Sequence, residues 1–341
     1  MKVFRPIVAP MLVAFAAFIA QGAAAQTVLR YSNFIPPGHV LRVKVFEPWI
    51  ADVEKVTSGR VKVEMLPKVV GTVAGQHDVV RDGLADVAVV VPSYSPGKFD
   101  LTEIVEVPFQ GDRAEIVSPA FFNFYEKHLA KYNEFQGTHV LTIFTNTPPS
   151  LYTAKRQVKT VDDFKGIKLR TSSVSMAQSV SLLGGVPVIK PVTDIYEMVN
   201  GGLVDGALFP PVDHKSFKLT QLLTRVTEIS GGISCSAVAL IINEAKWKSI
   251  SAADREAIMK VSGAHMARIA GKGYDDESRA ANEELKKAGG SFEVLSAQTV
   301  AELKKRLQPV EQSWAERARK KGMADPAAAL AALRAEIAAS K

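Results

Sequence analysis

Arg170 stands at the junction between a strand pattern and a helix pattern, in the segment FKGIKLRTSSVSMAQSVSLLGGVPV that runs from Phe164 to Val188. Ligands of parallel α/β sheets bind beyond the carboxyl ends of the strands, which is where Arg170 falls. A guanidinium offers a planar fork that matches a carboxylate with two hydrogen bonds. The following residues, TSSVS, add hydroxyl groups and backbone N–H groups at the start of a helix, and such a start attracts anions. The pattern indicates that Arg170 binds a carboxylate. The alternative is an exposed arginine at the end of a strand, which is the usual position of a charged side chain.

No constellation typical of an enzyme accompanies Arg170. The sequence contains no G-x-S-x-G, Walker or G-x-G-x-x-G pattern. None of its six histidines has H-E-x-x-H spacing: His39, His77, His128, His139, His214 and His265. A distant dyad of Cys235 and His214 is an alternative, although Cys235 begins the apolar segment SCSAVALII and is better interpreted as a small buried hydrophobe. We therefore expect no catalytic residue, no metal site and no cofactor.

A concealed repeat indicates how Arg170 is positioned. The segment DVVRDGLADVAVVVP, from Asp78 to Pro92, aligns without gaps with EMVNGGLVDGALFPP, from Glu197 to Pro211. Each copy is typical of a helix end, a glycine turn and an apolar strand that stops at proline. A strand pattern precedes each copy, at Ser58–Leu66 and at Lys165–Thr171. Two strand–helix–strand units of this kind predict an α/β protein with two lobes.

Other segments complete this prediction. Strand patterns cover Thr27–Phe34, Gly137–Asn146 and Cys235–Asn243. One long helical pattern starts at Ser251, which is a favourable N-cap, and its length would let it lie across both lobes. We expect residues 26–147 and 235–275 in lobe I, and residues 148–234 and 276–341 in lobe II, with the C-terminal helices.

The first 25 residues have the features of a cleaved signal peptide. Lys2 and Arg5 precede an apolar stretch, and an A-x-A site ends at Ala25. A membrane anchor is the alternative, but the apolar stretch is short and interrupted by prolines. Without the two basic residues of this segment the net charge of +7 becomes +5, which is too weak and too scattered to predict nucleic-acid binding. With one cysteine, the exported chain would lack an internal disulfide and depend on core packing.

The order of several motifs resembles the DctP family, the solute-binding proteins of tripartite ATP-independent periplasmic (TRAP) transporters. The segments that carry the resemblance include YSNFIPPGH, IVEVPF, DDFKGIKLRTSS, LLGGVPV and TDIYEMVNGGLVDGA. The resemblance covers essentially the whole mature chain. It implies a periplasmic, monomeric protein with two α/β lobes, a hinge and a long helix that braces both lobes. It also implies an organic acid held between the lobes, an Arg170 that clamps the ligand carboxylate, and membrane permease subunits as partners.

The sequence departs from this family in the expected cleft. Ser150 stands where many relatives have a second arginine, Phe209 where many have an asparagine, and Pro211-Val212 where others have Trp-Glu. Since a buried carboxylate without a partner is costly, these changes predict a monocarboxylate with an apolar or aromatic body. Tyr94 or His39 could hydrogen-bond a hydroxy or keto group, or be structural. The expected ligand contacts are Arg170, Phe209, Pro211, Tyr94, Ser93, Ser150, Phe34, His39 and Ser172.

Two other functions remain open at the level of the sequence. One is an enzyme built on a similar two-lobe scaffold, and the other is a ligand-loaded sensor that docks on a membrane kinase. Binding without turnover would argue against the enzyme. Genes for two membrane permease subunits next to this one would favour transport.

Overall fold

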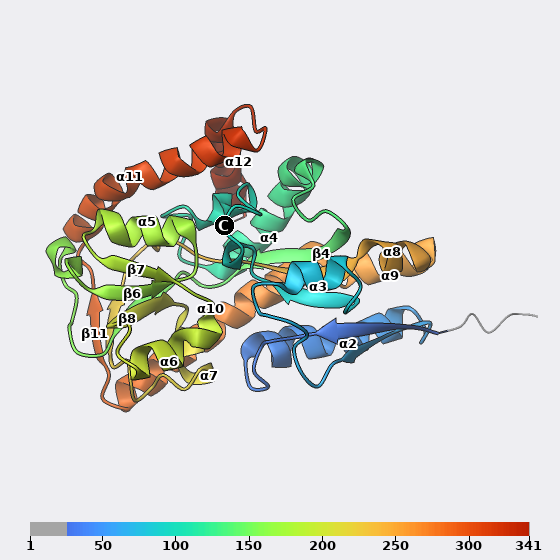
Figure 1. Cartoon of the computed structure of the whole chain (residues 1–341), viewed down its shortest axis with the longest axis horizontal. Helices are drawn as coiled ribbons and strands as arrows, with labels where there is room; N and C mark the ends of the chain where they lie inside the picture. Colours follow the sequence, from blue (N-terminus) through green and yellow to red (C-terminus); the bar gives the residue numbers. More distant parts are fainter. Residues whose placement is uncertain (1–25, 341) are drawn as a thin grey trace, which may run out of the picture.

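The computed structural model describes residues 26–340, which fold into two α/β lobes, each with its own sheet (Figure 1). The expected signal peptide lies outside the described residues. Sheet A has five strands in the order β2-β1-β3-β10-β4. Its strands are β1 Thr27–Ser32, β2 Val61–Met65, β3 Val87–Val90, β4 Thr138–Thr145 and β10 Ala237–Asn243.

Sheet B has six strands in the order β11-β9-β5-β8-β6-β7. Its strands are β5 Ser150–Thr153, β6 Lys168–Thr171, β7 Val186–Ile189, β8 Gly206–Phe209, β9 Arg225–Glu228 and β11 Ser291–Val294. The chain passes between the two sheets after β4, after β9 and along the helix that precedes β11, so several connections join the lobes.

The two sheets repeat one arrangement, which confirms the predicted pair of α/β lobes. In sheet A, β1 lies between β2 and β3 and is parallel to both. In sheet B, β6 lies between β7 and β8 and is parallel to both. An antiparallel strand follows in each sheet, β10 beside β3 and β5 beside β8. Gly83 and Gly202, with φ of 74° and 70°, make the same left-handed turn before β3 and β8.

Helices cover the sheets and connect them. The longer ones are α2 Glu47–Val56, α4 Ala114–Phe124, α5 Val174–Leu182, α9 Ala252–Lys260, α10 Gly263–Lys287, α11 Ala297–Lys320 and α12 Pro326–Ala339. The shorter α-helices are α3 Gln76–Arg81, α6 Ile195–Asn200, α7 Pro211–Ser216 and α8 Glu244–Ser249. Single turns of other helix types are η1 Leu41–Phe46, η2 Pro92–Tyr94, η3 Thr102–Glu106, η4 Tyr125–Leu129, η5 Ala130–Tyr132, η6 Val161–Phe164 and η7 Val192–Asp194.

The helical pattern that starts at Ser251 forms two helices, so the prediction of one continuous helix was wrong. Ser251 does cap α9, since its side chain accepts a hydrogen bond from the Asp254 N–H. The chain then leaves the helical conformation at Ser262, and Gly263 has φ of 52°. The Ser262 hydroxyl donates to the Ile258 carbonyl at 2.8 Å and accepts from Trp49 Nε1 at 2.9 Å, which stabilises the break. The second helix, α10, packs on α4 and β4 of one lobe and on α7 of the other, as the brace was expected to do.

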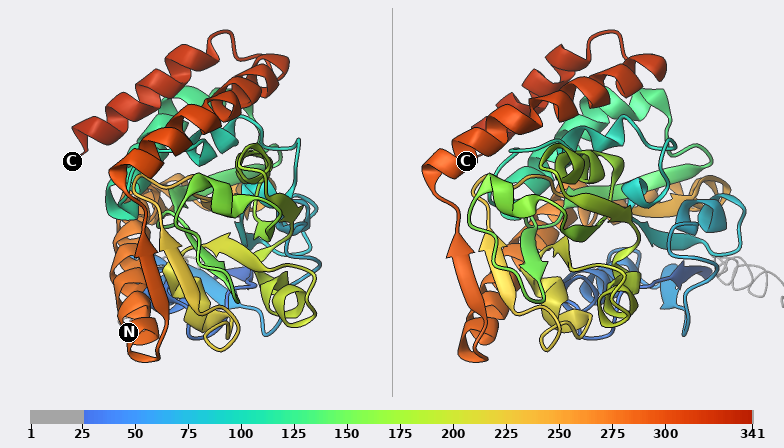
Figure 2. Two further views of the ribbon diagram at one scale, coloured as in Figure 1. Left: turned by 90° about the vertical axis from the view of Figure 1, so that its left-hand side faces the viewer. Right: turned by 60° about the vertical axis from the view of Figure 1, so that its left-hand side comes forward.

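The helix α11 also connects the two hydrophobic cores. Leu303 and Leu307, in its first half, pack in the core beside sheet B. Trp314 and Ala318, in its second half, pack in the core beside sheet A. Figure 2 shows α11 and α12 side by side along one edge of the molecule. The exact residues at which one lobe ends and the other begins stay a prediction, and α12 packs on α4 and α11.

Among the helices of residues 26–340, none combines the length and the apolar character that crossing a membrane requires.

Candidate ligand-binding site

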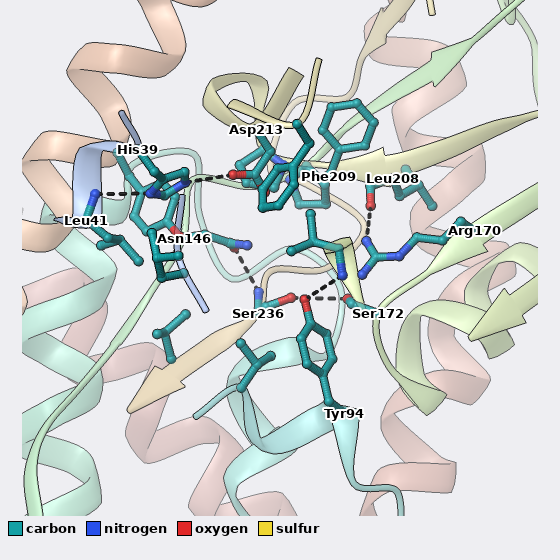
Figure 3. A pocket seen from close by; sticks show the side chains of 18 of the residues that line it. His39, Leu41, Tyr94, Asn146, Arg170, Ser172, Leu208, Phe209, Asp213 and Ser236 are labelled. Atoms are coloured by element: carbon teal, nitrogen blue, oxygen red, sulfur yellow. Dashed lines mark hydrogen bonds and ion pairs between the residues drawn. The ribbon is translucent and has the colours of Figure 1, made fainter. Parts of the chain in front are cut away.

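A cavity lies between the lobes, where the carboxyl ends of the parallel strands β1, β3, β6 and β8 converge (Figure 3). The volume of this cavity is about 40 Å³, so the two lobes stand close together. Much of the wall is apolar or aromatic, including Phe34, Ile35, Val91, Met176, Phe209 and Phe217. The polar side chains of the wall are Arg170, His39, Asp213, Tyr94, Tyr274, Asn146, Ser172 and Ser236.

Arg170 is held rigidly and keeps one donor group free. Its residue is 2% exposed, and Nε donates to the Lys190 carbonyl at 2.7 Å while Nη1 donates to the Leu208 carbonyl at 3.3 Å. Nη2 is buried without any hydrogen-bond partner. Within residues 26–340, no carboxylate pairs with this guanidinium, and it is the only lysine or arginine in the cavity wall. A buried cation with an unused donor is costly, so an anion at this position would stabilise it.

His39 and Asp213 form a buried pair that joins the lobes. His39 follows β1, Asp213 lies in α7 after β8, and His39 Nε2 stands 2.9 Å from Asp213 Oδ1. The Leu41 N–H donates to His39 Nδ1 at 3.1 Å. Because Nδ1 is an acceptor, the ring proton sits on Nε2, which donates to the carboxylate. Figure 3 shows this pair on the side of the pocket opposite Arg170.

Tyr94 makes a second connection between the lobes. It belongs to η2, directly after β3, and its hydroxyl oxygen accepts a hydrogen bond from the Val192 N–H at 3.1 Å. Burial raises the pKa of Tyr94, and the nearby Arg170 guanidinium opposes that rise only in part. The phenol therefore keeps its proton at neutral pH and can still donate it.

Three further polar side chains line the floor of the cavity. The hydroxyls of Ser172 and Ser236 stand 3.1 Å apart, and Asn146 Oδ1 accepts from the Ser236 N–H at 2.8 Å. This hydrogen bond to Oδ1 fixes the orientation of the Asn146 amide. Its NH₂ group has no partner among the described residues, so it is available as a donor at the cavity wall.

Phe209 belongs to an aromatic stack. Its ring lies parallel to that of Tyr152, with centroids 4.3 Å apart, and Tyr152 stacks in turn on His214 at 5.0 Å. His214 Nε2 bonds the Leu223 carbonyl, and the Cys235 thiol donates to the Val105 carbonyl. Burial raises the pKa of Cys235 well above its usual range, so the thiol stays protonated. Both residues of the alternative dyad therefore have structural contacts of their own.

The structure places six of the nine expected contact residues around one cavity: Arg170, Phe34, His39, Tyr94, Ser172 and Phe209. Ser150 and Pro211 line a neighbouring depression together with Glu228 and Asp275. Ser93 is fully buried beside Glu106, and its hydroxyl group opposes the rise in the pKa of that carboxyl group. The role of all nine in ligand binding stays a prediction.

Four polar residues of the wall were not among the expected contacts: Asn146, Asp213, Ser236 and Tyr274. Asp213 comes one helical turn after the end of β8, and Asn146 directly follows β4. The strand-end rule that selected Arg170 could have found both. Tyr274 lies in the middle of α10, and no local pattern indicates that it reaches this cavity.

A buried pair of acidic residues lies close to the site. Burial raises the pKa of Glu106 to about 8 and the neighbouring Glu103 carboxylate adds to the rise. Burial also raises the pKa of Glu103 to about 7, although Arg317 opposes this at 2.8 Å. Glu106 Oε1 accepts from the Ala237 N–H at 3.0 Å, while Oε2 has no partner. These contacts favour a protonated Glu106 at neutral pH.

The substitution Glu106→Gln should remove a pH dependence of stability. In the unfolded chain Glu106 has an ordinary pKa near 4.5, while burial raises the pKa in the folded protein to about 8. Between these values the folded protein keeps a proton that the unfolded chain releases, so stability falls as the pH rises, by at most about 1.4 kcal/mol per unit for one carboxyl group. Glutamine cannot titrate and can still accept from the Ala237 N–H.

Urea unfolding at several pH values between 5 and 8 measures this effect. The free energy of unfolding of Glu106→Gln should rise relative to the unsubstituted protein as the pH increases. The exposed Glu64→Gln is the matched control and should leave the profile unchanged. Parallel pH profiles for Glu106→Gln and the unsubstituted protein would show that Glu106 is ionised in the folded state.

Comparisons with known proteins agree with this architecture. The family described as bacterial extracellular solute-binding protein, family 7 (DctP) matches residues 31–318. The outer membrane transporter protein TsaT of Comamonas testosteroni is 28% identical over 88% of this chain and 89% of its own length. The C4-dicarboxylate-binding periplasmic protein DctP of Rhodobacter capsulatus is 25% identical over 77% of this chain and 79% of its own length.

Solved structures share the same fold along nearly the whole chain. A TRAP periplasmic solute-binding protein from Bordetella bronchiseptica, with bound (R)-mandelate and (S)-mandelate, is 35% identical with a TM-score of 0.88, and the match covers 92% of this chain and 100% of that one. A marine metagenome TRAP solute-binding protein specific for aromatic acids, in complex with 3-hydroxybenzoate, is 28% identical with a TM-score of 0.88, over 93% and 99% of the chains. With its inter-lobe cavity and the family match from residue 31 to residue 318, the chain belongs to the DctP family of bacterial extracellular solute-binding proteins, which serve TRAP transporters as substrate-binding proteins and not as enzymes.

Proposed function

We propose that this protein binds a small aromatic monocarboxylate between its lobes and delivers it to the membrane permease subunits of a TRAP transporter. The observation that carries the proposal is Arg170, a buried cation whose Nη2 has no partner at the wall of a cavity with several aromatic side chains. The ligand carboxylate accepts from Nη2, and the Tyr94 hydroxyl and the Asn146 amide are further donors within the same wall.

The lining of the cavity supports an aromatic body for the ligand. Phe209 is already stacked on Tyr152, so its position is fixed before a ligand arrives. Phe34 and Phe217 add further aromatic surface from the two lobes. Each Å² of apolar surface that such a ligand buries contributes about 25 cal/mol. The solved relatives with mandelate and 3-hydroxybenzoate bind acids of this kind.

A single carboxylate suits the charges of the wall. Arg170 is the only lysine or arginine among the lining residues of the described chain, so a second carboxylate would lose its hydration without gaining a cation. Phe209 lines the cavity. Ser150 lines the neighbouring depression, so the selectivity that we propose depends on Arg170 and Phe209.

Ligand uptake requires the lobes to separate. Arg170 and His39 are 2% and 1% exposed, so a ligand cannot reach them from solvent in this arrangement. The contacts His39–Asp213 and Tyr94–Val192 run between the lobes and would open with them. A ligand that touches both lobes stabilises the closed form, since it binds that form more tightly. We further propose that the protein is monomeric and that residues 1–25 direct its export to the periplasm.

Calorimetric titration of a panel of acids tests this function. Benzoate, mandelate and 3-hydroxybenzoate should bind and raise the melting temperature. Succinate, malate and glucuronate should produce a much smaller shift, because their additional oxygens would be buried without partners. The aromatic proposal would be wrong if a dicarboxylate or a sugar acid gave the largest stabilisation and the aromatic acids gave none.

A further inference from the structure

Asp213 is an acidic group in the wall of a cavity whose proposed ligand is an anion. Its side chain is 9% exposed, and Oδ1 accepts the hydrogen bond from His39 Nε2 at 2.9 Å. Within residues 26–340, no hydrogen bond reaches Oδ2, and no lysine or arginine pairs with the carboxylate. Asp213 is one of the residues that line the cavity.

The His39 ring does not neutralise this charge. Leu41 donates its N–H to Nδ1, so His39 holds a single proton, on Nε2. The other neighbours of the ring are aromatic: Tyr274 lies edge-on at 5.9 Å and Phe217 is tilted at 6.4 Å. The charge of Asp213 also acts on Tyr94 and Tyr274, where it adds to the rise in pKa that burial causes. Asp213 therefore presents an acceptor that carries negative charge.

Arg170 and Asp213 place a hydrogen-bond donor and a hydrogen-bond acceptor in the wall of the same cavity. The guanidinium has a free donor and no acceptor, while the carboxylate has a free acceptor and no donor. Both charges act on the Tyr94 hydroxyl, which places them around one cavity and not in separate sites. A ligand that satisfies both groups needs an anionic end and, apart from it, a hydrogen-bond donor.

We propose that Asp213 is a specificity-determining residue that accepts a hydrogen bond from a hydroxyl group of the ligand and repels a second carboxylate. This inference rests on the proposed function and narrows the ligand to a hydroxylated aromatic monocarboxylic acid. An unsubstituted acid leaves Oδ2 without a partner in a site closed to solvent. A dicarboxylic acid of the same size brings two anions together in a wall that holds one cation.

The same carboxylate ties ligand recognition to closure. Asp213 lies in α7 beside sheet B, and His39 lies in the loop after β1 of sheet A. A hydroxyl group of the ligand that donates to Oδ2 would bind the same carboxylate whose Oδ1 already accepts from His39 of the opposite lobe. A hydroxylated acid should therefore favour the closed form more than benzoate does.

Calorimetric titration with benzoate, 3-hydroxybenzoate and isophthalate tests the inference on the unsubstituted protein and on Asp213→Asn. Asparagine keeps an oxygen for His39 Nε2–H and removes the charge, whereas alanine would leave that N–H without a partner. The unsubstituted protein should bind 3-hydroxybenzoate about ten- to a hundredfold more tightly than benzoate, which is the usual effect of a hydrogen bond to a charged group. In Asp213→Asn this preference should shrink to a few fold, and isophthalate should bind about tenfold more tightly than before.

Asp162→Asn is the matched control, since Asp162 is 66% exposed on the same lobe and should change neither ratio. An equal preference for the hydroxyl in Asp213→Asn and in the unsubstituted protein would overturn the inference and leave Asp213 as a contact between lobes. The same follows if the unsubstituted protein binds benzoate and 3-hydroxybenzoate equally well. That outcome leaves the proposed function intact, whereas failure of every aromatic acid to bind would overturn both. The comparison within the unsubstituted protein remains decisive even if Asp213→Asn does not fold.

Discussion

Arg170→Ala should weaken the binding of benzoate and of 3-hydroxybenzoate by about ten- to a hundredfold, because a hydrogen bond to a charged group contributes ~1.5–3 kcal/mol and Arg170 has one free donor group. The free Nη2 is the only strong donor with a positive charge in the cavity wall of the described chain. Calorimetric titration measures the affinity. Arg170→Lys should also bind poorly, since an ammonium cannot hold the Lys190 and Leu208 carbonyls and present a fixed donor at the same time.

The matched control for Arg170 is Arg156→Ala. Arg156 belongs to the same lobe, but its side chain is 49% exposed, so its removal should change the affinity little. Thermal unfolding of both variants separates lost binding from lost structure, because Arg170→Ala also leaves two buried carbonyls without their donor. An Arg170→Ala protein that binds benzoate as tightly as the unsubstituted protein would remove Arg170 from the site.

Trp314→Ala should lower the free energy of unfolding by ~3–5 kcal/mol, which is the usual cost of truncating a buried tryptophan. Trp314 is 0% exposed, and its Nε1 donates to the Asp100 carbonyl at 2.9 Å. It attaches the second half of α11 to the core beside sheet A, while the first half belongs to the other core. Urea unfolding measures the loss.

Two further variants show whether that loss of stability comes from the Trp314 side chain. Trp314→Phe keeps most of the apolar volume and gives up the hydrogen bond, so it should cost less than the alanine variant. Glu316→Ala changes an exposed residue of the same helix and should stay within about 0.5 kcal/mol of the unsubstituted protein. A loss below about 1 kcal/mol for Trp314→Ala would mean that α11 is not anchored through this side chain.

The repeat in the sequence predicted the architecture because it reflects local geometry. The glycine turn before each apolar strand, at Gly83 and Gly202, is encoded within a few residues, and parallel strands bring their carboxyl ends to one edge. Arg170, Tyr94 and Phe209 follow or end such strands, so their position at one cavity could be predicted. The dipeptide Ser262-Gly263 is a known turn signal, and it indicates the helix break that the periodicity alone conceals.

The rest of the site depends on contacts between distant segments. Tyr274 reaches the cavity only because α10 crosses both lobes, and the pairing of His39 with Asp213 joins residues 174 positions apart. Ser150 pairs with Phe209 across two central strands of sheet B but lines the neighbouring depression. Which way such a residue faces follows from the register of β5 against β8, and no local pattern specifies that register.

A crystal structure of the protein grown with benzoate tests the central claim most directly. The account predicts the carboxylate within about 3 Å of Arg170 Nη2, inside the cavity between the lobes, with the ring against Phe209. A structure in which benzoate occupies another surface while Arg170 Nη2 stays without an anion would contradict it.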